Sequence, residues 1–239
     1  MKNKILYALL VLIAIFLLSC RTMSLNQTAE NLKKGKGESL FTPNVGGIFI
    51  YNPSPYSMPY IGDAFISLGY QQRFGLTDLI ELQFKHDIIL MFPLPEIISY
   101  TDFGVKFNLY EKDKFNIAII PYSGWFGGNG NRPITGPTTG FKFLVSGYND
   151  KFKNSPYFGS IIQFKKDIVY FEYNQNYEYL FDLDLGLSFG CEINRKVITR
   201  HEFSISSNIS FNNNASLGLI GVSCAYNISV GGDYFFKKK

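Results

Sequence analysis

The chain is poor in charge, in cysteine and in histidine. Only 18% of its 239 residues are Asp, Glu, Lys or Arg, whereas an average soluble domain carries about 25%. Three cysteines can form too few disulfide bonds to stabilise the fold of a chain of this length. No stretch beyond residue 37 has a helical apolar period. These shortages exclude a disulfide scaffold and do not fit an ordinary soluble domain.

The residues present are largely apolar and aromatic. Hydrophobic residues make up 46% of the chain and aromatic residues 17%, and the mean hydropathy is +0.02. Such a composition excludes intrinsic disorder. The pI of 8.8 comes from lysines near the two ends, Lys2, Lys4 and Lys237–Lys239, so it gives no reason to expect a nucleic acid as a partner.

The first twenty residues have the order of a targeting signal. Lys2 and Lys4 precede an apolar run from Ile5 to Leu18, which ends in Leu17-Leu18-Ser19-Cys20. This order resembles a bacterial lipoprotein signal, and the run is shorter than the ~20 residues of a spanning helix. We therefore predict a signal peptide at 1–19, lipidation of Cys20 and a lipidated tether at 20–37. An ordinary anchor helix is the less favoured alternative.

The body of the chain alternates between apolar and polar residues, which is typical of β-strands with two different faces. The clearest run of large apolar side chains at every second position is Tyr177, Tyr179, Phe181, Leu183, Leu185, Leu187 and Phe189. Turn signals divide the body into about twelve strands, with ten as the alternative count. The twelve lie near 38–50, 62–73, 79–90, 99–110, 114–124, 139–149, 156–164, 167–174, 177–190, 197–211, 215–224 and 228–236.

Strands of this kind fit either a soluble sandwich or a membrane barrel. Several alternate over about 10 to 14 residues, which suits a tilted strand that crosses a bilayer better than a soluble strand. Their polar face is rich in Gly, Ser and Asn, and the abundant Phe and Tyr suit interfacial girdles. We predict an all-β, antiparallel, up-and-down transmembrane β-barrel over 38–236, followed by a basic tail at 237–239. A soluble β-sandwich or β-barrel lipoprotein, acting as a periplasmic or surface binding module, is the alternative.

An even strand count places both chain ends on one side of the membrane, which we take as the periplasmic side. The connections Asn52–Ile61, Met91–Ile98 and Trp125–Thr138 are then outward loops. The last of these is a candidate surface for interactions with other molecules. Cys191 and Cys224 fall on strands that another strand separates, so we expect two free thiols.

Three segments carry a resemblance to a family of small bacterial outer-membrane β-barrel proteins. They are Ser24–Ala29 with Lys34–Glu38, then Arg73–Asp78, and then Thr101–Leu109 running into Lys114–Ile120. The first resembles a QTA…GKG pattern and the second an RYGLTD pattern, with Phe74 in place of the tyrosine. The resemblance implies insertion in the outer membrane of a diderm bacterium and says little about chemistry.

The end of the chain resembles the signal that the barrel-assembly machinery reads. A polar residue, a glycine and two spaced aromatics stand at Ser229, Gly231, Tyr234 and Phe236. This resemblance implies that the assembly machinery is a partner, together with membrane lipids.

Catalytic motifs are missing from the sequence, so we expect no enzyme activity, no cofactor and no metal. His201 and Ser204 fall on opposite faces of one strand, and His86 shares its face with apolar residues. No GxSxG, HExxH or phosphate-binding glycine loop is present.

The polar face is the place where a transport function would lie. It is expected to line the lumen with Glu81, Lys85, Asp87, Asp102, Lys106, Glu172, Glu178, Asp182, Asp184, Arg200 and Glu202. Paired charges would give a closed structural barrel, whereas the acidic excess would give a narrow, weakly cation-preferring channel for small solutes. Both readings stay open, as does a role in binding surface ligands.

Overall fold

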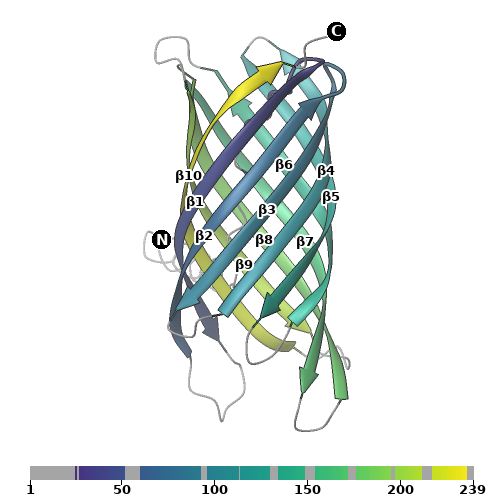
Figure 1. Ribbon diagram of the computed structural model, residues 1–239, viewed down its shortest axis with the longest axis vertical. Helices are drawn as coiled ribbons and strands as arrows, with labels where there is room; N and C mark the ends of the chain where they lie inside the picture. The colour runs from purple at the N-terminus through teal and green to yellow at the C-terminus, as the bar shows by residue number, and fades with distance from the viewer. Residues whose placement is uncertain are drawn as a thin grey trace, which may run out of the picture.

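Ten antiparallel strands close into one barrel (Figure 1). The computed structural model describes residues 25, 27–51, 60–92, 96–112, 114–129, 134–148, 154–171, 176–194, 197–211 and 217–235. The strands are β1 (Lys36–Tyr51), β2 (Tyr60–Gly75), β3 (Ile80–Phe92), β4 (Glu96–Lys112), β5 (Phe115–Asn129), β6 (Ile134–Gly147), β7 (Asn154–Phe171), β8 (Asn176–Asn194), β9 (Ile198–Phe211) and β10 (Leu217–Phe235). The predicted all-β antiparallel barrel is confirmed, with the lower of the two strand counts.

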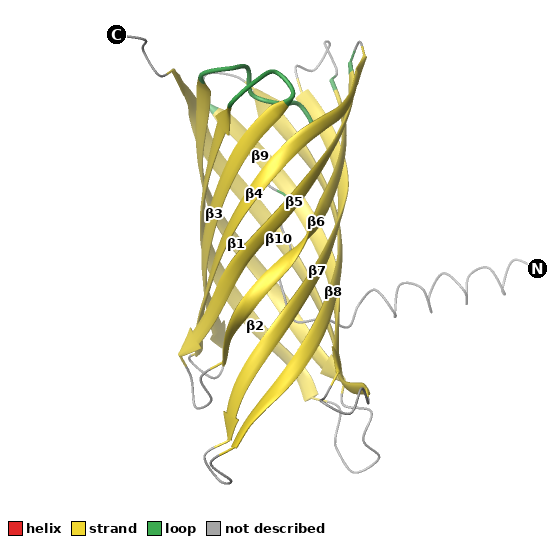
Figure 2. Cartoon of the chain, turned by 90° about the vertical axis from the view of Figure 1, so that its right-hand side faces the viewer, coloured by secondary structure: helices red, strands yellow, loops and turns green. Residues whose placement is uncertain are grey.

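Each strand pairs with the next in sequence, and β10 pairs with β1 to close the wall. The closing seam runs from Lys36 opposite Phe235 to Tyr51 opposite Ile220. The start of β1 and the end of β10 therefore share one end of the barrel with the connections at 76–79, 113–114, 148–153 and 195–197. We call this the turn end, which is uppermost in Figure 2, and the opposite end the loop end.

The two faces of the wall differ in the way that the alternation predicts. Phe181 and Leu185 are 50% and 37% exposed on the outer face, while Asp182 and Asp184 between them are buried. A soluble barrel would bury the apolar stripe instead. The outward apolar face therefore rules out the soluble alternative and is that of a membrane barrel. Among the described residues, no helix is long and apolar enough to cross a membrane.

The predicted count of twelve is corrected because two pairs of predicted strands are each one long strand. β7 (Asn154–Phe171) includes 156–164 and the described part of 167–174, and β10 (Leu217–Phe235) includes the described parts of 215–224 and 228–236. The polar residues between them had suggested turns. Lys165 instead points inward to Asp182, at 2.5 Å, and Asn227 is fully buried on the inner face. Polar residues in mid-strand are expected where the inner face of a barrel is itself polar.

The outward loops are shorter than predicted. β5 runs to Asn129 and β6 starts at Ile134, so most of Trp125–Thr138 is strand. Trp125 lies on the outer face, where its Nε1 donates to Thr135 Oγ1 at 2.9 Å. The predicted loop at Met91–Ile98 likewise shrinks to 93–95, which lies outside the described residues.

The range predicted as a tether, 20–37, is instead packed inside the barrel over most of its described part. Leu25, Gln27 and Ala29 have no exposed surface, and Lys36 and Gly37 already belong to β1. We call residues 25 and 27–35 the inner segment. It occupies the turn-end half of the lumen, so the barrel is filled there by a part of the chain that is not wall.

Candidate functional site

Side chains of the wall hold the backbone of the inner segment. Three of its N–H groups donate to side-chain oxygens of the strands: Leu25 to Glu202 at 2.9 Å, Ala29 to Ser146 at 3.0 Å, and Leu32 to Glu81 at 3.0 Å. Lys106 Nζ donates to the carbonyl oxygens of Thr28, at 2.9 Å, and of Glu30, at 2.5 Å. The partners come from β3, β4, β6 and β9, so the segment is held from around the lumen.

An apolar lining on one side of the lumen receives the segment's apolar side chains. Leu25 and Ala29 form one buried cluster with Ala118, Ile120, Tyr122, Leu144, Tyr157 and Ile161 of β5, β6 and β7. A side chain on Gly159 would lie 2.4 Å from Leu25 Cδ1, so the absence of a Cβ there makes room for Leu25. β5 therefore carries apolar residues on both faces, one for lipid and one for the segment.

A network of ion pairs crosses the turn end. Arg73 binds Glu38 at 2.8 Å and Glu81 at 2.6 Å, while Arg200 binds Glu38 at 2.8 Å and Glu192 at 2.7 Å. All five side chains are largely buried. Each charge has at least one opposite partner, as buried charges require. Arg73 also donates to the Glu30 carbonyl at 3.1 Å, which ties the inner segment to the network.

The segments that carry the family resemblance meet at this place. A side chain on Gly75 would lie 2.4 Å from the carbonyl oxygens of Leu32 and Lys33, so only glycine allows the inner segment to cross there. The Asp78 carboxylate accepts from Lys34 N at 3.5 Å. Lys106, from the motif Thr101–Leu109, also binds the inner segment. The segments that carry the family resemblance therefore form the binding site of the inner segment. From the sequence alone, they indicated only a family.

The inner segment joins β1 through a tight turn. Gly35 has φ of +77°, a left-handed conformation that glycine adopts without strain. Its N–H donates to Gly75 O at 2.9 Å, and Lys36 N donates to Lys33 O at 3.0 Å. Gly35 is therefore the hinge between wall and segment.

The central lumen is polar and only partly satisfied by protein. Lys85 binds Asp87 at 2.8 Å, and Lys165 binds Asp182. Among the described residues, five buried polar atoms of this region have no hydrogen-bond partner: Gln71 Oε1, Asp87 Oδ1, Asp102 Oδ1, Thr138 Oγ1 and Gln163 Nε2. Buried polar groups are normally satisfied, so this region suits water or a small polar solute.

An apolar cluster covers part of the lumen toward the loop end. It consists of Phe65, Ile89, Tyr100, Phe126 and Ala225 from β2 to β5 and β10. The facing strands carry polar residues instead, among them Asp184, Ser206 and Asn208. The lumen is thus asymmetric, with one apolar and one polar side.

Nearly all predicted lumen residues can be placed. Those that lie on the inner face are Glu81, Lys85, Asp87, Asp102, Lys106, Asp182, Asp184, Arg200 and Glu202. The side chain of Glu178 and the whole of Glu172 fall outside the described residues. The nine placed residues do not form one site. Glu81, Lys106, Arg200 and Glu202 surround the inner segment, and the others lie further into the lumen.

Several residues of the site were missed. They are Glu38, Arg73, Lys142, Lys165 and Glu192, together with the inner segment itself. The period of two would have found Arg73 and Lys142, because each shares the parity of its strand's inner face. Lys165 and Glu192 were hidden because each was assigned to a turn.

Other predicted positions are only partly described. Cys20 and Phe236 lie outside the described residues, so lipidation stays a prediction. Ser229 is buried, with Thr42 Oγ1 donating to its hydroxyl at 2.9 Å, and Gly231 and Tyr234 belong to β10 at the closing seam. His86 and His201 lie on the outer-face parity of β3 and β9, and Cys191 and Cys224 are free thiols.

Glu30 is the carboxylate of the inner segment that faces a small hollow of about 130 Å³. The hollow lies between the segment and the wall at the turn end, and Glu192 and Asp233 also line it. Partial burial, and then the negative charge of Glu192, raise the pKa of Glu30, while Lys106 and Arg73 act in the opposite direction.

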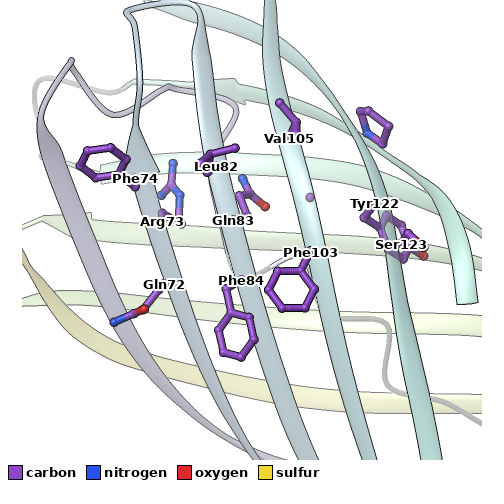
Figure 3. Close-up of a pocket in the computed structure, with 12 residues that line it drawn as sticks. Gln72, Arg73, Phe74, Leu82, Gln83, Phe84, Phe103, Val105, Tyr122 and Ser123 are labelled. Atoms are coloured by element: carbon purple, nitrogen blue, oxygen red, sulfur yellow. The ribbon is translucent and has the colours of Figure 1, made fainter. Parts of the chain in front are cut away.

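A second hollow, of about 670 Å³, lies over β2 to β5 (Figure 3). Most of its lining belongs to the outer face, including Phe74, Leu82, Phe84 and Phe103. It is therefore a groove of the lipid-facing surface and not a chamber of the lumen.

Among the described residues, no group of three or more His, Cys, Asp or Glu could hold a metal ion.

No protein-family model matches the chain, and no curated protein matches it. Solved structures of similar shape include the outer membrane protease OmpT from Escherichia coli, at 10% identity and a TM-score of 0.43, covering 87% of this chain and 100% of that one. An outer membrane channel from Pseudomonas putida F1 is similar at 7% identity and a TM-score of 0.45, covering 84% and 97%. Neisserial surface protein A is similar at 7% identity and a TM-score of 0.37, covering 80% and 96%.

The chain is a closed β-barrel with an apolar outer face. The expectation that it is not an enzyme is corrected by the first of the similar structures, because OmpT is a protease and a barrel of this kind does not exclude catalysis. At 10% identity the likeness concerns the fold and brings no activity to this chain.

Proposed function

We propose that this protein is a narrow channel for small polar solutes in the outer membrane, closed at rest by its own inner segment. One observation carries the proposal: the turn-end half of the lumen is occupied by a separate segment, and not by side chains of the wall alone. All strand pairs of the wall are formed without it. The segment can therefore leave through the hinge at Gly35 while the barrel stays closed.

The central lumen supports a polar solute. The unpartnered oxygens of Gln71, Asp87 and Asp102 and the amide of Gln163 offer hydrogen bonds that the protein does not use itself. Acidic side chains slightly outnumber basic ones on the described inner face, so cations are favoured weakly. The solute path passes these groups on β2, β3, β4 and β7 and continues toward the loop end along the polar side chains of β8 and β9.

A closed barrel with a structural or surface-interaction role is the second candidate. It is favoured by the ion pairs of Glu38 with Arg73 and Arg200, which fill the turn end in addition to the inner segment. In both cases we propose that Cys20 is lipidated, that the protein is inserted by the barrel-assembly machinery, and that the turn end faces the periplasm.

Planar-bilayer recordings test the channel. The full chain is expected to give rare, brief current steps, whereas a variant lacking residues 25–34 gives stable ones, with a reversal potential in a KCl gradient that shows cation preference. Heat-modifiable electrophoretic mobility serves as the control that the variant is folded. A folded variant without current steps would leave the closed structural barrel as the function.

A further inference from the structure

The inner segment is bound as a separate extended peptide would be. Its described backbone–backbone hydrogen bonds are confined to the hinge, from Gly35 to Gly75 and from Lys36 to Lys33. Elsewhere its N–H and C=O groups bind wall side chains, as given above. Hydrogen bonds to the main chain provide affinity for a peptide without regard to its side chains.

Alternate side chains of the segment provide the selectivity. Leu25 lies in the apolar lining. The Gln27 and Gln83 side-chain amides donate to each other, at 2.9 and 2.6 Å. Ala29 is completely buried in the same apolar cluster as Leu25, so a larger residue at its position would need the cluster to move. The site therefore selects an apolar residue, an amide two positions later and an alanine after two more.

We propose that the lumen is a binding site for an extended peptide of this pattern, which enters from the turn end. The inner segment fills this site with a part of the same chain. When the segment has withdrawn, a separate peptide with the same pattern binds in its place. Withdrawal leaves Lys106 and Glu202 buried with fewer partners, which favours refilling. The hollow beside Glu30 leaves the segment loosely packed on that side.

Cutting the segment from the folded full chain tests the site. A recognition sequence for a site-specific protease is placed between Lys33 and Lys34, both of which are exposed. The barrel is folded in lipid and then cleaved. A fluorescent synthetic peptide of residues 24–33 is added, and its anisotropy is followed as the cleaved fragment exchanges.

Saturable binding, competed by the unlabelled peptide, is the expected result. A peptide with Ala29→Leu should not bind, whereas one with Glu30→Gln should bind as well as the parent, because Arg73 and Lys106 bind the backbone carbonyl of Glu30, which the substitution keeps. Lys106→Met in the barrel removes two hydrogen bonds from a charged donor and should weaken binding by about tenfold or more. Lys166→Met, on the outer face, is the matched barrel control.

A fragment that never leaves a folded, cleaved barrel would overturn the proposal, because the segment would then be a fixed part of the core. Equal binding of the Ala29→Leu and parent peptides would overturn it as well. Anisotropy reports binding and not conductance. A barrel that binds the peptide but passes no current would refute the channel alone.

Discussion

Glu38 is the residue on which the turn-end network depends. Its carboxylate accepts from Arg73 of β2 on one side and from Arg200 of β9, beyond the closing seam, on the other. No other described carboxylate binds both arginines. Glu38 thus bridges the two guanidinium groups, each of which also binds a carboxylate of its own, Glu81 for Arg73 and Glu192 for Arg200.

Glu38→Gln is expected to lower the free energy of unfolding by about 3–5 kcal/mol, because it leaves two buried arginines with one carboxylate fewer. Urea unfolding of the barrel in lipid, followed by electrophoretic mobility, measures the loss. Glu111→Gln removes an exposed carboxylate and should cost only about 0–1 kcal/mol. Equal losses for the two variants would show that the network does not stabilise the barrel.

At the scale of elements, the seam between β1 and β10 includes a close backbone approach that only a glycine permits. A Cβ on Gly231 would lie 1.9 Å from Ser39 O, whereas one on Gly232 would meet nothing within 4 Å. Two neighbouring glycines of one strand therefore differ completely in what they tolerate.

Gly231→Ala is expected to destabilise the barrel by about 1–3 kcal/mol or more, because the seam must open to accept the methyl group. Gly232→Ala should be neutral. Refolding yield and unfolding of purified protein, without any assembly machinery, give the comparison. A matching loss in both variants would argue against a steric cause.

The strand elements were largely predictable, and the failures have a physical cause. The period of two placed Lys85, Asp102 and Asp182 on the inner face, where they lie. The same rule failed at Lys165, because a lysine followed by another lysine and an aspartate resembles a turn. Only the pairing with Asp182 on the neighbouring strand makes it a mid-strand residue.

The inner segment could not have been predicted from local sequence. Gln27 and Thr28 are polar and follow no period, so they resemble a tether. Their burial is stabilised by Gln83 and Lys106, which are distant in sequence and come close only when the barrel is closed. The segments that carry the family resemblance include the residues that make these contacts. A resemblance, however, does not show which of the segments contact one another.

At the scale of the whole molecule, the outer face is adapted to lipid. Phe103 lies in the middle of β4 and is 61% exposed. Phe103→Arg is expected to cost about 2–4 kcal/mol in a bilayer, as charged residues do near the midplane of a barrel. Unfolding in lipid vesicles measures it, with Phe103→Leu as the apolar control. An arginine tolerated as well as leucine would place this face in water.

The depth of Leu25 has a mechanical consequence for a lipid on Cys20. Leu25 packs against Gly159, which lies five residues along β7 from its turn-end residue, Asn154. Five peptide units separate Cys20 from Leu25, and they span at most about 18 Å when fully extended. Acyl chains embedded in the membrane outside the wall would pull on a segment seated inside it. Lipidation of Cys20 would then pull on the inner segment, and this pull would lower the work needed to withdraw the segment from the lumen.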